Sequence, residues 1–497
     1  MKSRKRAAGI LMPIASLPGE YGIGTLGQAS YDFVDMLALA GQTYWQILPL
    51  GPTGYGDSPY QSFSTFAGNP YLIDPQMLIE DGLLTKAECD AFDFGASRVI
   101  TDYGRIYEGR FKLLRKAYGR AGDILKSKKY RAFVKANESW LDDYALYTAV
   151  KESFEGKSFI LWDEDIRKRK SSALKEYKKR YADDIEFVKF MQFMFYEQWS
   201  RLKAYANEKG IRIVGDIPIY VAFDSADTWS CPEMFLFDDE GYPTVVAGVP
   251  PDCFSTTGQL WGNPIYNWDY HKNTGYKWWI ERVAHCFEIY DVVRIDHFRA
   301  FDTYYTIPYG RKDAVVGKWN KGPGMQLFKA IEASLGEVDL IAEDLGDLFD
   351  SVRKLVKRTG YPGMKILEFA FNAGQDSEYL PHNYDRNCVV YTGTHDNATV
   401  VGWYQTLKKA DRKMVRDYLN IKEDDAKTVC DGLIRLAMMS SADTCIIPMQ
   451  DWLGLDNRAR INIPSTLGGN WQWRMKEGAF TKTLARRIAQ ITKIYAR

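Results

Sequence analysis

The distribution of short apolar runs is the feature of this 497-residue chain that most restricts its fold. Eight such runs, each about the length of one strand, recur along the sequence with helical patterns between them. Runs such as "RIVGDIPIYV" and "VDLIAEDLG" are apolar at consecutive positions, which is typical of strands buried on both faces. The runs occupy residues 9–16, 44–50, 212–220, 292–297, 338–344, 364–371, 388–395 and 444–450.

The segments between the runs supply the crossovers that a parallel sheet requires. "GMQLFKAIEASLG" and "SVRKLVKRTG" are helical patterns that lie between consecutive runs. Eight strand–helix units predict an α/β fold, a (β/α)8 TIM barrel. A doubly wound sheet is built from the same units and stays open as the alternative.

Two longer stretches interrupt this alternation. Residues 71–205 are Lys-rich and mostly helical, and they predict a helical insertion between strands two and three that ends in a barrel helix. Residues 235–276 are irregular and rich in Pro, Gly and aromatic residues, which predicts an active-site loop insertion after strand three. Because no Pro/Gly/Ser linker divides the chain, we expect a single catalytic domain over residues 1–497.

Composition narrows the function classes. A net charge of +1 argues against a nucleic-acid partner, and no apolar run is long enough to span a membrane. Aromatic residues make up 14% of the chain, and exposed rings suit ligands with apolar faces such as sugars. The seven cysteines form no C-x-x-C pair, which favours a reduced compartment and a cytoplasmic location. The basic, apolar N-terminus imitates a signal peptide, but Pro13 interrupts its apolar run.

Charged side chains gather where four of the predicted strands end. Barrel enzymes build their sites at the carboxyl ends of the strands, so we expect these side chains to converge on one rim. Two carboxyl groups on either side of a glycosidic bond can act as nucleophile and as proton donor. The residues are Asp216 after strand three, Arg294, Asp296 and His297 at strand four, Glu343 and Asp344 at strand five, and His395 and Asp396 at strand seven.

Other roles for these residues stay open. Asp344 fits a cap for the following helix, and Asp216 fits a structural ion pair with Arg294. A metal-dependent hydrolase also uses Asp and His at strand ends. The chain has only five histidines, which are few for a His-rich metal site, and we predict no metal. His297 and His395 are better placed as hydrogen-bond donors to a substrate. No nucleotide-binding glycine motif follows a strand, so we expect no cofactor.

Three of these segments resemble the catalytic regions of a known family. "RIDHFR" (294–299), "IAEDLG" (341–346) and "THDN" (394–397) are similar to the amylase superfamily in its 4-α-glucanotransferase form, glycoside hydrolase family 77, also called amylomaltase or disproportionating enzyme. The resemblance extends nearly end to end. It includes "SLPGEYGIGTLG", "YWQILPLGPTGYGDSPYQSFSTFAGNPYLI", "GDIPIYV", "PPDCFSTTGQLWGNPIY" and "GNWQWR".

The resemblance implies a role for each matching residue. Asp296 would be the nucleophile, Glu343 the general acid/base and Asp396 the stabiliser of the transition state. Further residues would bind the substrate or support those that do. They are Tyr60, stacked on the sugar; Asp216, supporting Arg294; Arg294, keeping Asp296 ionised; His395, at the same subsite; Gln259 and Trp261, in the loop over the site; Asn462, a contact in the site; and Tyr55, at a secondary glucan contact.

The implied activity is transfer of α-1,4-glucan segments to the 4-hydroxyl of glucose or another glucan, with retention of the bond type. An α-1,4-glucan hydrolase and a non-catalytic glucan-binding protein are the alternatives. Cys253 stands where related sequences often carry an aromatic residue in the "PPDxFS" loop, and "ARINIP" (459–464) is also slightly altered. These departures affect loop stacking or product size and leave the three carboxylates in place.

Overall fold

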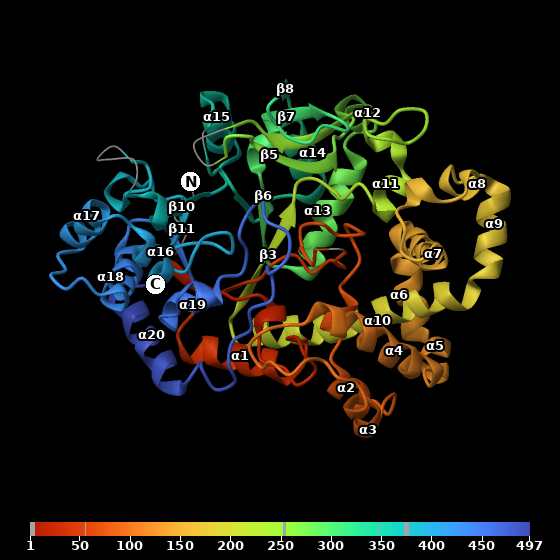
Figure 1. Ribbon diagram of the computed structural model, residues 1–497, viewed down its shortest axis with the longest axis horizontal. Helices are drawn as coiled ribbons and strands as arrows, with labels where there is room; N and C mark the ends of the chain where they lie inside the picture. Colours follow the sequence, from red (N-terminus) through yellow and green to blue (C-terminus); the bar gives the residue numbers. More distant parts are fainter. Residues whose placement is uncertain (1–4, 55, 252–254, 347, 372–376) are drawn as a thin grey trace.

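The computed structural model describes residues 5–54, 56–251, 255–346, 348–371 and 377–497. Eight parallel strands form its central sheet, in the order β10-β11-β12-β1-β2-β3-β6-β9 (Figure 1). The ring closes between β9 and β10, where the Ala342 amide donates to the Pro362 carbonyl at 3.0 Å. The strands are β1 (Ala7–Leu11), β2 (Tyr44–Gln46), β3 (Arg212–Pro218), β6 (Val292–Asp296), β9 (Leu340–Ala342), β10 (Gly363–Ile366), β11 (Cys388–Tyr391) and β12 (Thr444–Pro448).

Each of the eight predicted runs overlaps one of these strands, although β1 and β10 begin slightly before their runs, and the (β/α)8 barrel is confirmed. Several strands are shorter than their runs because the chain turns into a 3-10 helix at the rim, as η6 (Leu367–Phe369) does after β10. Apolar side chains fill the barrel interior, as the consecutive apolar positions predicted. They are Leu11, Val214, Val292, Ile341, Met364, Ile366, Val389, Tyr391 and Ile446.

Helices cover the outside of the barrel. The 27-residue α10 (Ala182–Glu208) buries Phe187, Phe190 and Met191, and the first two rings pack on Tyr118 of the helical insertion, which confirms the prediction of core packing for that face. Between β10 and β11 the described residues hold two 3-10 turns, η6 and η7 (Pro381–Asn383), and no α-helix. The other helices of the barrel layer are α1 (Gln28–Leu39), α13 (Lys277–Ile289), α14 (Met325–Leu335), α15 (Asp350–Thr359), α16 (Val400–Thr406), α17 (Lys409–Leu419), α18 (Ala426–Met439), α19 (Met449–Trp452) and α20 (Lys482–Ile494).

The segment between β2 and β3 is helical and extends to one side of the barrel (Figure 1). It packs on α10. Its helices are α2 (Pro75–Glu80), α3 (Lys86–Asp90), α4 (Tyr103–Gly119), α5 (Gly122–Lys126), α6 (Lys128–Ala136), α7 (Glu138–Ser153), α8 (Glu164–Arg167) and α9 (Ser171–Arg180). Across the described ranges, no helix is both long and apolar enough to cross a membrane.

The stretch 235–276 is more regular than the sequence analysis expected. It carries β4 (Val245–Val249), β5 (Gln259–Pro264) and α12 (Trp268–Asn273), and it follows the short α11 (Ala226–Ser230). With β7 (Thr303–Pro308) and β8 (Lys318–Lys321), β4 and β5 form an antiparallel sheet in the order β5-β4-β7-β8. This small sheet lies beyond the carboxyl end of β6 (Figure 1), so it borders the rim where the site lies.

Candidate active site

The register of β3 against β6 places the first charges of the site. Asp216 and Arg294 are paired positions in the two strands, and both are almost fully buried. Arg294 Nη1 donates to both carboxylate oxygens of Asp216 at 2.7 Å, and Nη2 donates to Asp296 Oδ1 at 2.9 Å. The predicted support of Arg294 by Asp216 is therefore seen directly. The Arg294 guanidinium thus donates to two carboxylates, and its bonds to the buried Asp216 fix its orientation.

Asp296 stands at the last position of β6, with its side chain 32% exposed. Burial raises the pKa of Asp296 above the ordinary aspartate range, and the adjacent Arg294 opposes that rise. A carboxylate nucleophile must be ionised to attack, so Arg294 favours the reactive form.

Glu343 follows β9 and is held by backbone groups. Its Oε2 accepts the His297 amide at 2.7 Å, and its Oε1 accepts the Leu345 amide at 2.8 Å. Burial and the charge of Asp296 raise the pKa of Glu343 to about 7, although Arg294 and the two amides oppose this shift. A carboxyl group with that pKa can release or take a proton near neutral pH.

His297 connects these carboxylates to the small antiparallel sheet. It adopts the left-handed region at φ 51°, and its ring meets the indole of Trp261 edge-on at 4.7 Å between centroids. Burial lowers the pKa of His297 to about 3, so its ring is neutral near pH 7. On β5, the Trp261 indole N–H donates to Gln259 Oε1 at 3.1 Å. Gln259 and Trp261 thus lie on a strand, and Trp261 contacts the residue that follows β6; their role in the loop over the site stays a prediction.

An aromatic wall stands beside the charged groups. The Tyr60 hydroxyl donates to Asp216 Oδ2 at 2.8 Å, and its ring stacks on His395 at 5.1 Å with an interplanar angle of 16°. The Trp471 ring lies 5.9 Å from that of Tyr60. Flat ring surfaces of this kind suit the apolar face of a sugar. The sequence analysis missed Trp471, although it lies in the quoted "GNWQWR" segment.

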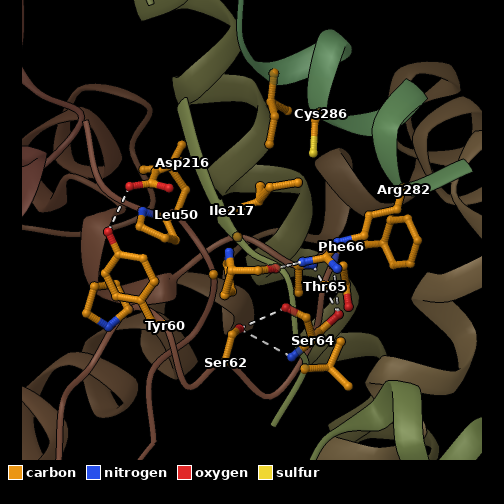
Figure 2. A pocket seen from close by; sticks show the side chains of 18 of the residues that line it. Leu50, Tyr60, Ser62, Ser64, Thr65, Phe66, Asp216, Ile217, Arg282 and Cys286 are labelled. Carbon is orange, nitrogen blue, oxygen red and sulfur yellow. Dashed lines mark hydrogen bonds between the residues drawn. The ribbon is translucent and has the colours of Figure 1, made fainter. Parts of the chain in front are cut away.

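A small cavity of about 50 Å³ borders the Tyr60–Asp216 pair (Figure 2). Leu50, Ile217 and Cys286 are among the side chains that line it, and the Tyr60 hydroxyl points toward Asp216. The space can hold a few water molecules.

Asp396 lies after β11 and is held by a distant segment of the chain. Asn462 Nδ2 donates to Asp396 Oδ1 at 2.7 Å, and His395 Nε2 lies 3.4 Å from the same oxygen. Arg460 Nη2 donates to the Asp396 carbonyl at 2.6 Å, and the Asn462 amide donates to the His395 carbonyl at 3.1 Å. The expected contact of Asn462 with the site is present.

Some predicted residues have other places or lie outside the structure. Asp344 does not cap a helix, because Phe349 precedes α15; its Oδ1 accepts the Met364 amide at 2.7 Å and links β9 to β10. The misreading arose because a strand-end carboxylate can serve the next strand as well as the next helix. Tyr55 and Cys253 lie outside the described residues.

A buried carboxyl group at β10 was also missed. Glu368 lies in η6 at the rim and is 3% exposed. A glutamate inside the apolar run "MKILEFAF" was the signal that could have found it. Within the described ranges, no group of three His, Cys, Asp or Glu side chains is placed to hold a metal ion.

Comparison with known proteins relates this geometry to a family. The sequence model of a family described as 4-alpha-glucanotransferase matches residues 12–481. A 4-alpha-glucanotransferase from Clostridium butyricum is 49% identical over 98% of this chain and 100% of its own length. One from Streptococcus pneumoniae serotype 4 is 50% identical over 99% of this chain and 98% of its own. An amylomaltase from Streptococcus agalactiae, solved in complex with acarbose, has a TM-score of 0.96 and 41% identity over 99% of this chain and 100% of its own.

Proposed function

The chain belongs to the 4-alpha-glucanotransferase family, and on that premise we propose that it transfers segments of α-1,4-glucans by a retaining double displacement. One observation carries this proposal. Asp296 lies against a cation that favours its ionised form, while Glu343 on the neighbouring strand has a pKa of about 7. Two carboxyl groups in such different environments match the division into nucleophile and proton donor that glycosidic chemistry requires.

In the first step, an Asp296 carboxylate oxygen attacks the anomeric carbon of the donor. The bond from that carbon to the leaving oxygen breaks as Glu343 transfers its proton to the oxygen. The shortened glucan departs, and the transferred segment remains as an ester on Asp296. Asp396, with His395 beside it, is placed to hold the sugar hydroxyls next to the reacting carbon and to favour the transition state.

In the second step, Glu343 acts as a base. It takes the proton of the 4-hydroxyl of glucose or another glucan, and that oxygen attacks the anomeric carbon and releases Asp296. Each step inverts the configuration at the anomeric carbon, so the product again has an α-1,4 bond. The reaction is balanced without a cofactor, and both donor and acceptor are maltooligosaccharides or longer glucans.

Transfer instead of hydrolysis requires that a sugar reach the ester before water does. The rings of Tyr60, Trp471 and Trp261 offer surfaces that bind an acceptor and exclude solvent. We also place the enzyme in the cytoplasm. That location is supported by Cys89, Cys231, Cys286, Cys388, Cys430 and Cys445, which are free thiols among the described residues.

Incubation of the purified protein with maltotriose tests the proposal. We expect a ladder of shorter and longer maltooligosaccharides with a constant number of reducing ends, measured by chromatography and a reducing-end assay. A rising number of reducing ends would identify an α-1,4-glucan hydrolase. Unchanged maltotriose, with binding of the sugar still detectable, would identify a non-catalytic glucan-binding protein.

A further inference from the structure

Glu368 is a buried carboxyl group that the proposed mechanism does not use. It follows β10 at the same rim as the catalytic carboxylates, and its side chain is almost completely removed from solvent. Its backbone amide donates to the Thr392 carbonyl at 3.2 Å, which joins η6 to the first residue after β11. Glu368 therefore lies directly beneath the turn that carries His395 and Asp396.

The Glu368 carboxyl group contacts that turn at two points. The Asn397 side chain interacts with it, while Glu368 Oε1 has no hydrogen-bond partner within the described part of the chain. Asn397 Oδ1 already accepts the Thr394 amide at 2.9 Å and the Thr394 hydroxyl at 2.8 Å, so the Asn397 amide nitrogen is the group that serves Glu368. A side chain at Gly393 would place its Cβ 2.9 Å from Glu368 Oε1, closer than packing allows. The carboxyl group is thus packed against the bare backbone of the turn.

Neighbouring tethers fix the same turn from other sides. Arg460 interacts electrostatically with Glu368, and its guanidinium donates to the carbonyls of Asp396 at 2.6 Å and Asn462 at 2.7 Å. The buried Asp451 accepts the Thr392 hydroxyl at 2.6 Å and the Val400 amide at 2.9 Å. The turn is therefore held at both ends by Asp451 and in its middle by Arg460 and by Asn397.

The environment of Glu368 favours its neutral form. A neutral carboxyl group suits a structural role at the rim better than a further negative charge beside the catalytic carboxylates would. Burial, with a smaller contribution from Asp451, raises the pKa of Glu368 well above the ordinary glutamate range. Burial thus favours the neutral form, and a neutral carboxyl group can be replaced by an amide of the same shape without losing its ability to accept a hydrogen bond.

We propose that Glu368 is a positioning residue: by holding Asn397 it fixes the 393–396 turn, so that Asp396 and His395 face the reacting sugar. The inference rests on the proposed role of Asp396 in the transition state. A shift of about 1 Å at such a group lowers the rate about 100-fold while leaving substrate binding largely intact. The contribution of Glu368 is therefore expected in kcat.

The test compares Glu368→Leu, Glu368→Gln, Asn397→Ala and the double variant Glu368→Leu/Asn397→Ala in maltotriose disproportionation. We expect Glu368→Leu and Asn397→Ala each to lower kcat by about 10- to 100-fold, with KM within about threefold of wild type. Glu368→Gln should stay within about threefold of wild type in kcat. The kcat of the double variant should lie within about threefold of that of the slower single variant, because both changes remove the same link.

Asp74→Asn is the matched control for a change to a buried carboxyl group, because its partners, Thr25 before α1 and Met77 in α2, lie outside the 393–396 turn. It should lower Tm and leave kcat unchanged. Full kcat in Asn397→Ala, multiplicative losses in the double variant, or equal losses in Glu368→Gln and Glu368→Leu would each overturn the proposal. If Glu368→Leu does not fold, the Gln and Asn397→Ala variants decide it. Full kcat in Asp396→Asn would instead overturn the proposed function itself.

Discussion

Two walls of the site are built in different ways. The strand wall consists of Asp216, Arg294, Asp296 and Glu343 on β3, β6 and β9, whose register places Asp216 opposite Arg294. The turn wall consists of residues 393–397, which are tethered by Arg460 and Asn462 from more than 60 positions away. The barrel itself sets the geometry of the strand wall. The turn wall depends on a few hydrogen bonds, so it can lose its geometry while the barrel stays folded.

Asp296→Asn tests the strand wall most severely. The amide keeps the shape of the side chain but cannot form the ester, so we expect kcat for maltotriose disproportionation to fall at least about 10,000-fold. Circular dichroism and Tm should stay close to those of the wild type, because Arg294 remains bound to Asp216. Wild-type-like turnover would remove Asp296 from the mechanism.

Glu343→Gln removes the proton donor from the same wall. We expect a loss in kcat of about 100- to 10,000-fold with maltotriose, and a smaller loss with a maltosyl fluoride, whose leaving group needs no proton. In the wild type, kcat/KM should decrease above about pH 7, where Glu343 loses its proton. An alkaline limb that persists unchanged in the Gln variant would assign that limb to another group.

Asn462→Ala tests whether the turn wall depends on its tethers. The change removes the 2.7 Å hydrogen bond to Asp396 Oδ1 and keeps the backbone bond to His395. We expect kcat to fall about tenfold, which is the scale for one hydrogen bond to a charged group. The control is Asn207→Ala, which removes an amide bonded to Ile211 and Asp291 at the amino end of β3. Equal kcat in the two variants would mean that the turn keeps its geometry without Asn462.

The last expected effect concerns the stability of the fold, and it belongs to the strand wall. Because the folded-state pKa of Glu343 is raised from 4.5 to about 7, the folded protein binds the extra proton between those values and becomes less stable as pH rises through that window. Glu343→Gln should therefore be more stable than the wild type by about 3 kcal/mol near pH 8 and equal to it near pH 4. Urea unfolding at the two pH values measures this. A Gln variant that is less stable near pH 8 would contradict the raised pKa.

The comparison of the walls also explains what the sequence could predict. The eight barrel strands were predictable because consecutive apolar residues mark strands buried on both faces, and Asp296 and Glu343 were predictable because they end such runs. The small antiparallel sheet was not, since β8 reads "KWNK" and has no fully buried residue. Glu368 was hidden among apolar neighbours, and Arg460 reaches the site only through tertiary contacts. Local patterns thus predict the strand wall, whereas the turn wall requires the fold.

Capture of the covalent intermediate tests the central claim most directly. Glu343→Gln incubated with α-maltotriosyl fluoride should form the ester on Asp296 and hydrolyse it slowly, because the base of the second step is missing. Mass spectrometry of the digested protein should then find one maltotriosyl group on the peptide that contains Asp296, and none when Asp296→Asn is added. A label on another carboxylate, or turnover of the fluoride with no label and inverted product, would contradict a retaining double displacement through Asp296.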